Sequence, residues 1–144
     1  TLAEEWKFEF AGGRLIGPDA VRCRDETGIT ANGQPEVFSR IFRGFSLYLP
    51  QVLAEAGLSQ EEVERALSLC ESRLSVPLAT PPMPIQDAID LGRFLVEATV
   101  QYSRFSPGAP SVGGPVEIAA VTKHEGFKWV QRKYYFDSAY NPSE

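Results

Sequence analysis

The most constraining feature of the sequence is a helix-to-hairpin pattern in its last third. Apolar residues recur at helical spacing over residues 85–102, and the stretch Ser106 to Pro110 ends that pattern. The Ser-Val-Gly-Gly-Pro stretch 111–115 leads into an apolar run over 116–122, which a turn at 124–126 separates from an aromatic stretch reaching about Phe136. Because glycine tolerates backbone angles that other residues avoid, the pattern predicts a long helix that pivots at the twin glycines into an antiparallel hairpin.

The first quarter of the chain predicts a strand and a short helix. Residues 6–10 alternate apolar and polar side chains, which is typical of a half-buried strand, and Gly12-Gly13 ends it. Proline is common at the first position of a helix, so Pro18 predicts one or two helical turns over residues 19–24. Asn32-Gly33 indicates a turn in the polar stretch that follows.

The centre of the chain predicts two helices. Apolar side chains recur every three or four residues over 35–56, where Pro50 is expected to kink or split the helix and Gly57 to end it. Ser59 with Glu62 three residues later is the pattern of a capping box, so a second, antiparallel helix is expected to start there after a tight turn. Its expected buried stripe consists of Val63, Ala66, Leu67, Cys70 and Leu74.

These elements define the expected architecture. Four prolines within residues 75–84 stop helix formation and favour a rigid extended connector, with a polyproline ligand for another domain as the alternative. A length of 144 residues fits a single domain over residues 1–144. The expected fold class is α+β, with layered helices packed on a small, mainly antiparallel sheet.

Composition excludes several classes of function. The net charge of −5 disfavours nucleic-acid binding, which needs a basic face to neutralise phosphates. No apolar run approaches the roughly 20 residues of a membrane helix, and no secretion signal is visible, so no membrane partner and a cytoplasmic location are expected. Cys23 and Cys70 are expected to be reduced, partly buried thiols, with a disulfide as the alternative.

Residues with catalytic chemistry are sparse. His124 is the only histidine and is expected in an exposed turn, which disfavours a histidine-dependent nucleophile or a zinc site. The acidic groups at residues 61–64 and at Asp87 and Asp90 are explained by the preference of carboxylates for the first turns of helices. We therefore expect no metal site and no cofactor.

The order of these elements resembles a known family. Over residues 84–133, the helix, Ser-x-Gly-Gly turn, apolar strand, Glu-Gly turn and aromatic strand are similar to the closing half of proteasome β-subunit-like proteins, which are N-terminal-nucleophile (Ntn) hydrolases. Residues 6–20 resemble the family's strand that ends in Ala-Gly and runs into a helix. The helices over 35–74 would be the central pair that packs on the sheet. Little chain precedes Trp6 and only residues 75–84 separate the helices, so the resemblance implies an incomplete Ntn-hydrolase-like sandwich.

The same resemblance implies where a catalytic set would lie. The family uses an N-terminal threonine whose α-amine is the base, and Thr1 could take that role only as a true mature N-terminus. Lys7 is the only lysine early in the chain. The family's Asp and Ser before the twin glycines correspond to Ala109 and to Ser111 or Val112, so the carboxylate is missing. The catalytic residues are therefore unknown apart from Thr1.

Two functional hypotheses follow. The first is a proteasome-subunit-like protein related to threonine-type peptidases, catalytically incomplete in this form, with a peptide as the implied substrate. The second is a non-enzymatic structural or interaction subunit that self-associates through its helical layer, because many aromatic residues on a thin sheet leave apolar surface exposed. Both hypotheses predict a homo-oligomer or an assembly with related subunits.

Overall fold

The structure is a computed structural model that describes residues 4–23, 26, 28–80, 83–108 and 112–133. It is a mixed α+β chain, and the described part holds two hairpins and four helices. In chain order these elements are β1 (Glu5–Ala11), β2 (Arg14–Arg22), α1 (Glu36–Phe42), α2 (Leu49–Glu55), α3 (Gln60–Leu74), α4 (Ile85–Phe105), β3 (Ile118–Thr122) and β4 (Gly126–Gln131).

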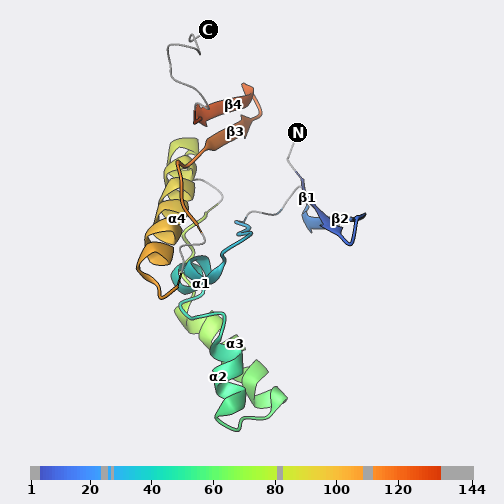
Figure 1. Ribbon diagram of the computed structural model, residues 1–144, viewed down its shortest axis with the longest axis vertical. Helices are drawn as coiled ribbons and strands as arrows, with labels where there is room; N and C mark the ends of the chain where they lie inside the picture. The colour runs from blue at the N-terminus through green and yellow to red at the C-terminus, as the bar shows by residue number, and fades with distance from the viewer. Residues whose placement is uncertain (1–3, 24–25, 27, 81–82, 109–111, 134–144) are drawn as a thin grey trace.

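The elements lie along one long axis (Figure 1). The β3–β4 hairpin is at one end, α4 and α1 occupy the middle, and α2 and α3 are at the other end, while the β1–β2 hairpin stands to one side of the helices. The strands form two separate two-stranded antiparallel sheets within the described residues. Where the chain is described, α4 is the helix that contacts a strand, at β3. This corrects the prediction of one sheet beneath a layer of helices.

The first hairpin confirms the predicted strand over residues 6–10 but not the helix after Pro18. β2 runs from Arg14 through Pro18 to Arg22, and it pairs with β1 in antiparallel register. Gly12 and Gly13 make the connecting turn, both with positive φ. Ladder hydrogen bonds to β1 therefore decide the conformation of residues 19–22, and they outweigh the preference of proline for a helix start. Cys23 is described outside any helix, and residue 24 lies outside the described residues.

The predicted long helix over 35–56 is two helices. The break falls at residues 43–48, before Pro50, and Pro50 lies in the first turn of α2. Gly44 has a φ of +80°, a left-handed conformation that ends α1. A Cβ on Gly44 would lie 2.6 Å from Cβ of Leu74, so the chain also approaches α3 closely there. The split expected from Pro50 is therefore confirmed, with Gly44 and this packing ending α1 and Pro50 in the first turn of α2.

Hydrogen bonds fix the loop between α1 and α2. Ser39 is the most buried polar residue described, with 1 % of its surface exposed, and its hydroxyl donates to the Phe45 carbonyl at 2.9 Å. The backbone N–H of Val76 donates to the Phe42 carbonyl at 2.9 Å, which holds the end of α1 against the chain after α3. The Arg43 guanidinium lies over the Phe45 ring and pairs with Glu71 of α3. Residues 36–76 thus form a connected helical unit.

The start of α3 confirms the predicted capping box. The Glu62 backbone N–H donates to the Ser59 side chain, and the Ser59 backbone N–H donates to the Glu62 carboxylate at 2.8 Å. These hydrogen bonds to the charged form lower the pKa of Glu62. Gly57, with a φ of +93°, ends α2, so the antiparallel α2–α3 pair and its tight turn are confirmed as well. Of the predicted stripe on α3, Val63 is buried and Leu74 is exposed.

The helix-to-hairpin pattern is confirmed over its described part. α4 covers the predicted helix, and β3 pairs with β4 through a turn at residues 123–125. Gly114 has a φ of +94° and provides the left-handed position between them. The second strand is shorter than predicted, because it ends at Gln131, and residues 134–136 lie outside the described residues.

The buried core is small. Among the described apolar residues only Val37, Phe45 and Val63 are buried, and all three belong to the helical unit 36–76. Large apolar side chains of α4 and of both hairpins are exposed, among them Phe10, Phe94, Phe105 and Phe127. Much of the apolar surface of these elements is therefore uncovered by the described chain.

Candidate functional site

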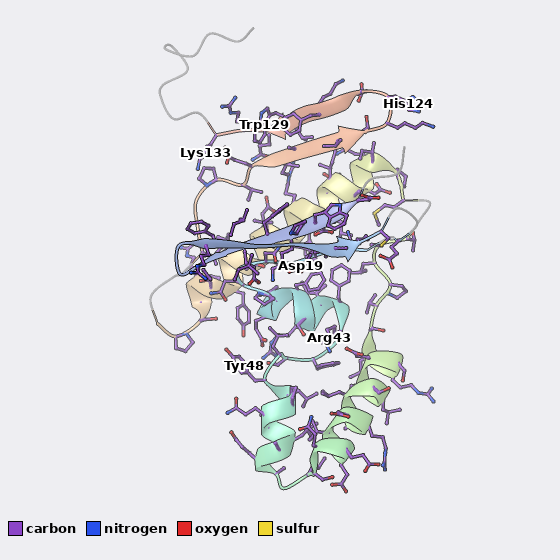
Figure 2. The ribbon with its side chains drawn as sticks, turned by 90° about the vertical axis from the view of Figure 1, so that its right-hand side faces the viewer. Asp19, Arg43, Tyr48, His124, Trp129 and Lys133 are labelled. Atoms are coloured by element: carbon purple, nitrogen blue, oxygen red, sulfur yellow. The ribbon has the colours of Figure 1, made fainter. Side chains whose placement is uncertain are left out.

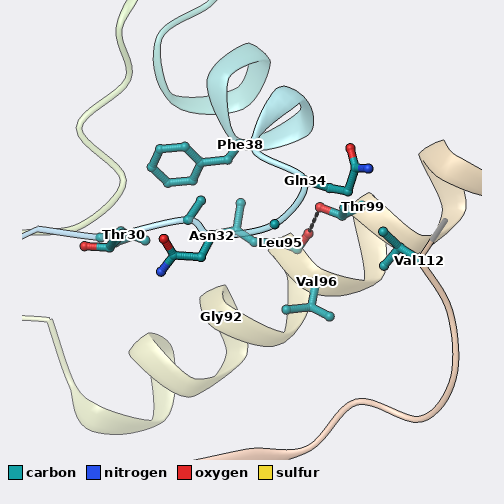
Figure 3. A pocket seen from close by; sticks show the side chains of 12 residues that line it. Thr30, Asn32, Gln34, Phe38, Gly92, Leu95, Val96, Thr99 and Val112 are labelled. Atoms are coloured by element: carbon teal, nitrogen blue, oxygen red, sulfur yellow. Dashed lines mark hydrogen bonds between the residues drawn. The ribbon is translucent and has the colours of Figure 1, made fainter. Parts of the chain in front are cut away.

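A groove runs along α4, which we call the α4 groove (Figure 3). Its volume is about 640 Å³. One wall is the extended segment 29–34, Phe38 of α1 closes one side, and Leu95, Val96 and Thr99 of α4 form the other wall. Gly92 leaves open space where a side chain would stand. All the residues that line the groove are uncharged, although the chain carries a net charge of −5.

A second hollow adjoins the first at Gln34 and Thr99. It has a volume of about 310 Å³ and includes Glu36, Tyr48 and Tyr102 in its lining. Glu36 has a side chain that is 15 % exposed and accepts three hydrogen bonds, from the Arg40 guanidinium at 2.7 Å, the Ser46 hydroxyl at 2.7 Å and the Leu47 N–H at 3.0 Å.

Glu36 is held as a carboxylate by these contacts. Burial acts to raise its pKa, but the three hydrogen bonds and the nearby positive charge of Arg40 outweigh burial, so the pKa of Glu36 lies below its ordinary value. The hydrogen bond between Arg40 and Glu36 also raises the pKa of the Arg40 guanidinium. The Glu36 carboxylate is thus saturated by structural partners, and its role is to fix the loop after α1.

The β1–β2 hairpin has one apolar and one charged face. Side chains on one face belong to Trp6, Phe8 and Phe10 of β1 and Leu15 of β2, which we call the aromatic arm face; they are 50 %, 57 %, 76 % and 65 % exposed. The opposite face carries Lys7, Glu9, Asp19 and Ile16, because alternate residues of a strand point to opposite sides. The predicted half-buried strand is therefore amphipathic as expected, but its apolar face is not covered within the described chain.

The hairpin is tied to the wall of the groove by a polar cluster. Arg22 donates to the Thr30 hydroxyl at 2.9 Å, Thr30 donates to the Glu5 carboxylate at 3.0 Å, and Arg22 pairs with Glu5 at 2.7 Å. A hollow of about 270 Å³ lies beside this cluster, and its lining includes Trp6, Phe8, Thr30 and Asn32. Thr30 and Asn32 also line the α4 groove, so the two hollows share a wall.

Of the residues that the family resemblance implies, the structure describes Val112 and Lys7. Thr1, Ala109 and Ser111 lie outside the described residues. Val112 lines the α4 groove, and Lys7 pairs with Glu9, whose hydrogen bond raises the pKa of Lys7. No arrangement of nucleophile, base and oxyanion donor can be read from these positions.

The other candidate residues have local roles. His124 lies in the turn at the tip of the β3–β4 hairpin and is exposed (Figure 2). Both cysteines are free thiols, and Cys23 is exposed rather than partly buried as predicted, because the expected helix around it does not form. Over the described residues, no group of three or more histidine, cysteine or acidic residues could hold a metal ion.

Most of the acidic residues at the starts of α3 and α4 have structural partners in their own helix or its cap. Glu62 belongs to the capping box, Glu61 pairs with Arg65 at 2.9 Å, and Glu64 accepts from Gln60 at 2.9 Å. Asp90 accepts from Gln86 one turn earlier on α4. These contacts lie on exposed helix surfaces, where they contribute little to stability.

Sequence reasoning missed the α4 groove. Residues 29–34 were expected to be a polar region with a turn at Asn32-Gly33, and Gly33 does bend with a φ of +89°. That the same segment forms a wall of the groove was not expected, and the alternation of Ile29 and Ala31 with Thr30 and Asn32 was the available signal. The side of α4 on which residues recur at helical spacing over 85–102 is only partly covered. Leu95 and Thr99 are partly buried, Ala88 and Tyr102 are exposed, and no described residue of α4 is buried.

One polar atom of α4 also indicates that this helix is incompletely covered. Nε of Arg93 is buried and has no hydrogen-bond partner among the described residues. Buried polar atoms in complete folds nearly always have partners. The surroundings of α4 thus combine an uncharged concave lining with exposed aromatic residues on the neighbouring hairpin.

Two further findings concern the chain rather than the site. Within the described chain, no helix has both the length and the apolar character needed to cross a bilayer. Comparison with protein-family models, with curated proteins and with solved structures gave no match to this chain.

Proposed function

We propose that this chain is a proteasome-subunit-like protein, related to threonine-type peptidases, that is catalytically incomplete and acts as a structural subunit of an assembly. The relationship is supported by the pattern over residues 84–133, whose described part has the expected order of helix, left-handed glycine and hairpin. In this proposal the helices and the hairpins are the parts of an incomplete Ntn-hydrolase-like sandwich, and their open faces are covered by other subunits.

The single observation that carries the assembly role is the uncovered apolar surface. Aromatic residues occupy the open faces of both hairpins, and Trp6, Phe8 and Phe10 on one and Phe127 and Trp129 on the other are each 50 % or more exposed. Contiguous exposed apolar surface of this kind marks interaction sites in folded proteins. Association with further copies or with related subunits would cover it.

The proposal of an incomplete catalytic set is supported by the residues at the positions that the family uses. Ala109 stands where the family has its aspartate, and alanine can neither accept a proton nor orient a base. Two free thiols favour a reducing compartment, so we place the protein in the cytoplasm. A peptide substrate belongs only to the active version of this proposal.

The experiment that tests the proposal separates activity from assembly. The purified chain is incubated with a peptide epoxyketone that reacts with N-terminal threonine, and its intact mass is then measured alongside hydrolysis of fluorogenic peptides. We expect neither an adduct nor cleavage, together with an oligomer in sedimentation velocity at micromolar concentration. An adduct at Thr1 would overturn the incomplete catalytic set, and a stable monomer would overturn the assembly role.

A further inference from the structure

The β1–β2 hairpin and the α4 groove each lack a covering element, and their surfaces match in chemistry. The aromatic arm face presents Trp6, Phe8 and Phe10 on one side of a strand. A two-stranded hairpin is marginally stable by itself in water and gains stability when its apolar face packs on a helix. The β1–β2 hairpin contacts no helix within the described chain. Both halves of a packing surface are therefore present but separate.

We infer that the aromatic arm face of one copy seats in the α4 groove of a second copy, and that the exchange is reciprocal. This inference rests on the proposed assembly role and names its contact surface. A twofold dimer of this kind buries the same pair of surfaces twice, because each copy supplies one arm and one groove.

The lining of the groove determines the chemistry of its occupant. Phe38, Leu95 and Val96 offer apolar contacts, while Thr30 and Asn32 place polar groups at the rim. A charged segment would lose its hydration there without gaining an ionic partner, since the lining is uncharged. The volume of about 640 Å³ lies within the range of pockets that enclose ligands several rings in size. Aromatic side chains at alternate positions of a strand meet these requirements.

The polar cluster at the base of the hairpin favours a second copy over the chain's own arm. Glu5, Arg22 and Thr30 fix the hairpin to the outer wall of its own groove, and the hairpin stands beside the helices rather than over them (Figure 1). For its own aromatic arm face to enter its own groove, the hairpin would have to break this cluster. The arm of a second copy can enter with both clusters intact.

The area that this exchange buries fits a specific dimer. An aromatic side chain buries about 150–250 Å², and the three of the arm are about half to three quarters exposed, so two reciprocal arms with the facing groove surface would bury roughly 900–1,300 Å². That range lies at the lower end of specific protein interfaces, near the roughly 1,000 Å² that a specific interface needs. The charged face with Lys7, Glu9 and Asp19 remains toward solvent.

The first test changes one face of the arm at a time. In Phe8→Asp, a charge on the aromatic arm face would enter the uncharged groove, and we expect the dissociation constant of the dimer to rise at least tenfold in sedimentation equilibrium. Ile16→Asp is the matched control, because Ile16 has similar exposure on the opposite face of the same hairpin. On α4, Val96→Asp lies in the groove and Phe94→Asp outside it, so only the former should weaken the dimer. Equal effects of both members in each pair would overturn the inference.

The second test uses cross-linking and does not depend on the stability of the charged variants. In a background with Cys23→Ser and Cys70→Ser, a tagged chain with Phe8→Cys is mixed with an untagged chain carrying Val96→Cys, under mild oxidation. We expect a covalent heterodimer on a non-reducing gel. When both cysteines are in one chain, an intramolecular disulfide that keeps the chain monomeric would overturn exchange between copies.

The outcomes also separate this inference from the proposed function. An oligomer that persists in Phe8→Asp and gives no heterodimer would overturn the arm contact and leave the assembly role intact. A reaction with the epoxyketone would overturn the incomplete catalytic set and leave the arm contact intact. A heterodimer together with no adduct supports both.

Discussion

The helical unit 36–76 and the β1–β2 hairpin both pair an apolar with a polar side, yet only the helical unit buries any of its apolar residues. In the helical unit, Val37, Phe45 and Val63 are buried, and hydrogen bonds from Ser39 and to Glu36 fix the loop that brings them together. In the hairpin, the ladder and the turn are complete, but the aromatic arm face is open. Local hydrogen bonding is thus enough to shape an element, whereas burial needs a second element to pack against it.

Among the substitutions that test this comparison, the one at Gly44 is expected to change the free energy of unfolding most. In Gly44→Ala, a side chain would be forced into a left-handed conformation and to within 2.6 Å of Cβ of Leu74 and 2.8 Å of its carbonyl oxygen. We expect the free energy of unfolding to fall by about 2–4 kcal/mol, from backbone strain and overpacking together. Urea denaturation followed by circular dichroism measures it.

Gly57 provides the matched control for Gly44. It also has positive φ, but a Cβ there would meet open space, so Gly57→Ala should cost only the backbone strain, about 1 kcal/mol. Equal losses at the two glycines would show that the contact between the loop after α1 and Leu74 does not contribute to stability.

A smaller effect is expected from the Glu36 carboxylate. Its pKa is lower in the folded than in the unfolded chain, so the unfolded chain binds more protons as the pH falls below the ordinary value near 4.5. The stability that Glu36 contributes is therefore present above that pH and is lost as the pH falls through the folded pKa. Glu36→Gln should cost about 1.5 kcal/mol at pH 7, the scale of a hydrogen bond to a charged group.

The pH series for Glu36 is read from urea midpoints. Between about pH 5 and pH 3, the difference between the wild-type chain and Glu36→Gln should shrink as the carboxylate of the wild type is protonated. A difference that stays constant over this range would mean that Glu36 stabilises the loop by its shape rather than by its charge.

The smallest effect is expected on the open face of the second hairpin. Val121 is 73 % exposed, so Val121→Thr should change the free energy of unfolding by no more than about 0.5 kcal/mol. Val63→Thr places the same hydroxyl at a residue that is 4 % exposed and should cost about 1–3 kcal/mol. Similar losses at the two valines in the dissociated chain would break the comparison, because they would mean that the chain itself covers this face of β3.

Helices and turns were predicted correctly where a short sequence pattern determines them. The capping box at Ser59, the hairpin around the turn at 123–125 and the long helix α4 depend on neighbours within a few residues, and all are confirmed. The helix expected after Pro18 was wrong, because pairing with β1 is a contact that the sequence of residues 18–24 does not contain.

The candidate site was less accessible to sequence reasoning. The α4 groove joins residues 29–34, α1 and α4, which are far apart in the chain, and no local pattern places them side by side. The break between α1 and α2 was expected at Pro50, but the approach of Gly44 to Leu74 moved it upstream. In both cases the deciding contact lies between residues that are 30 or more positions apart.

The sequence by itself determined most of the helices and strands and which side of each is apolar, because caps, turns and side-chain periodicity act over one or two turns of chain; residues 18–22 are the exception, since pairing with β1 made them a strand. Only the tertiary structure decided which apolar sides are covered. Coverage depends on contacts between distant segments, and these exist for α1 to α3 but leave the aromatic arm face and the α4 groove open. The physical reason is that burial is a property of two surfaces together, while periodicity describes each surface alone.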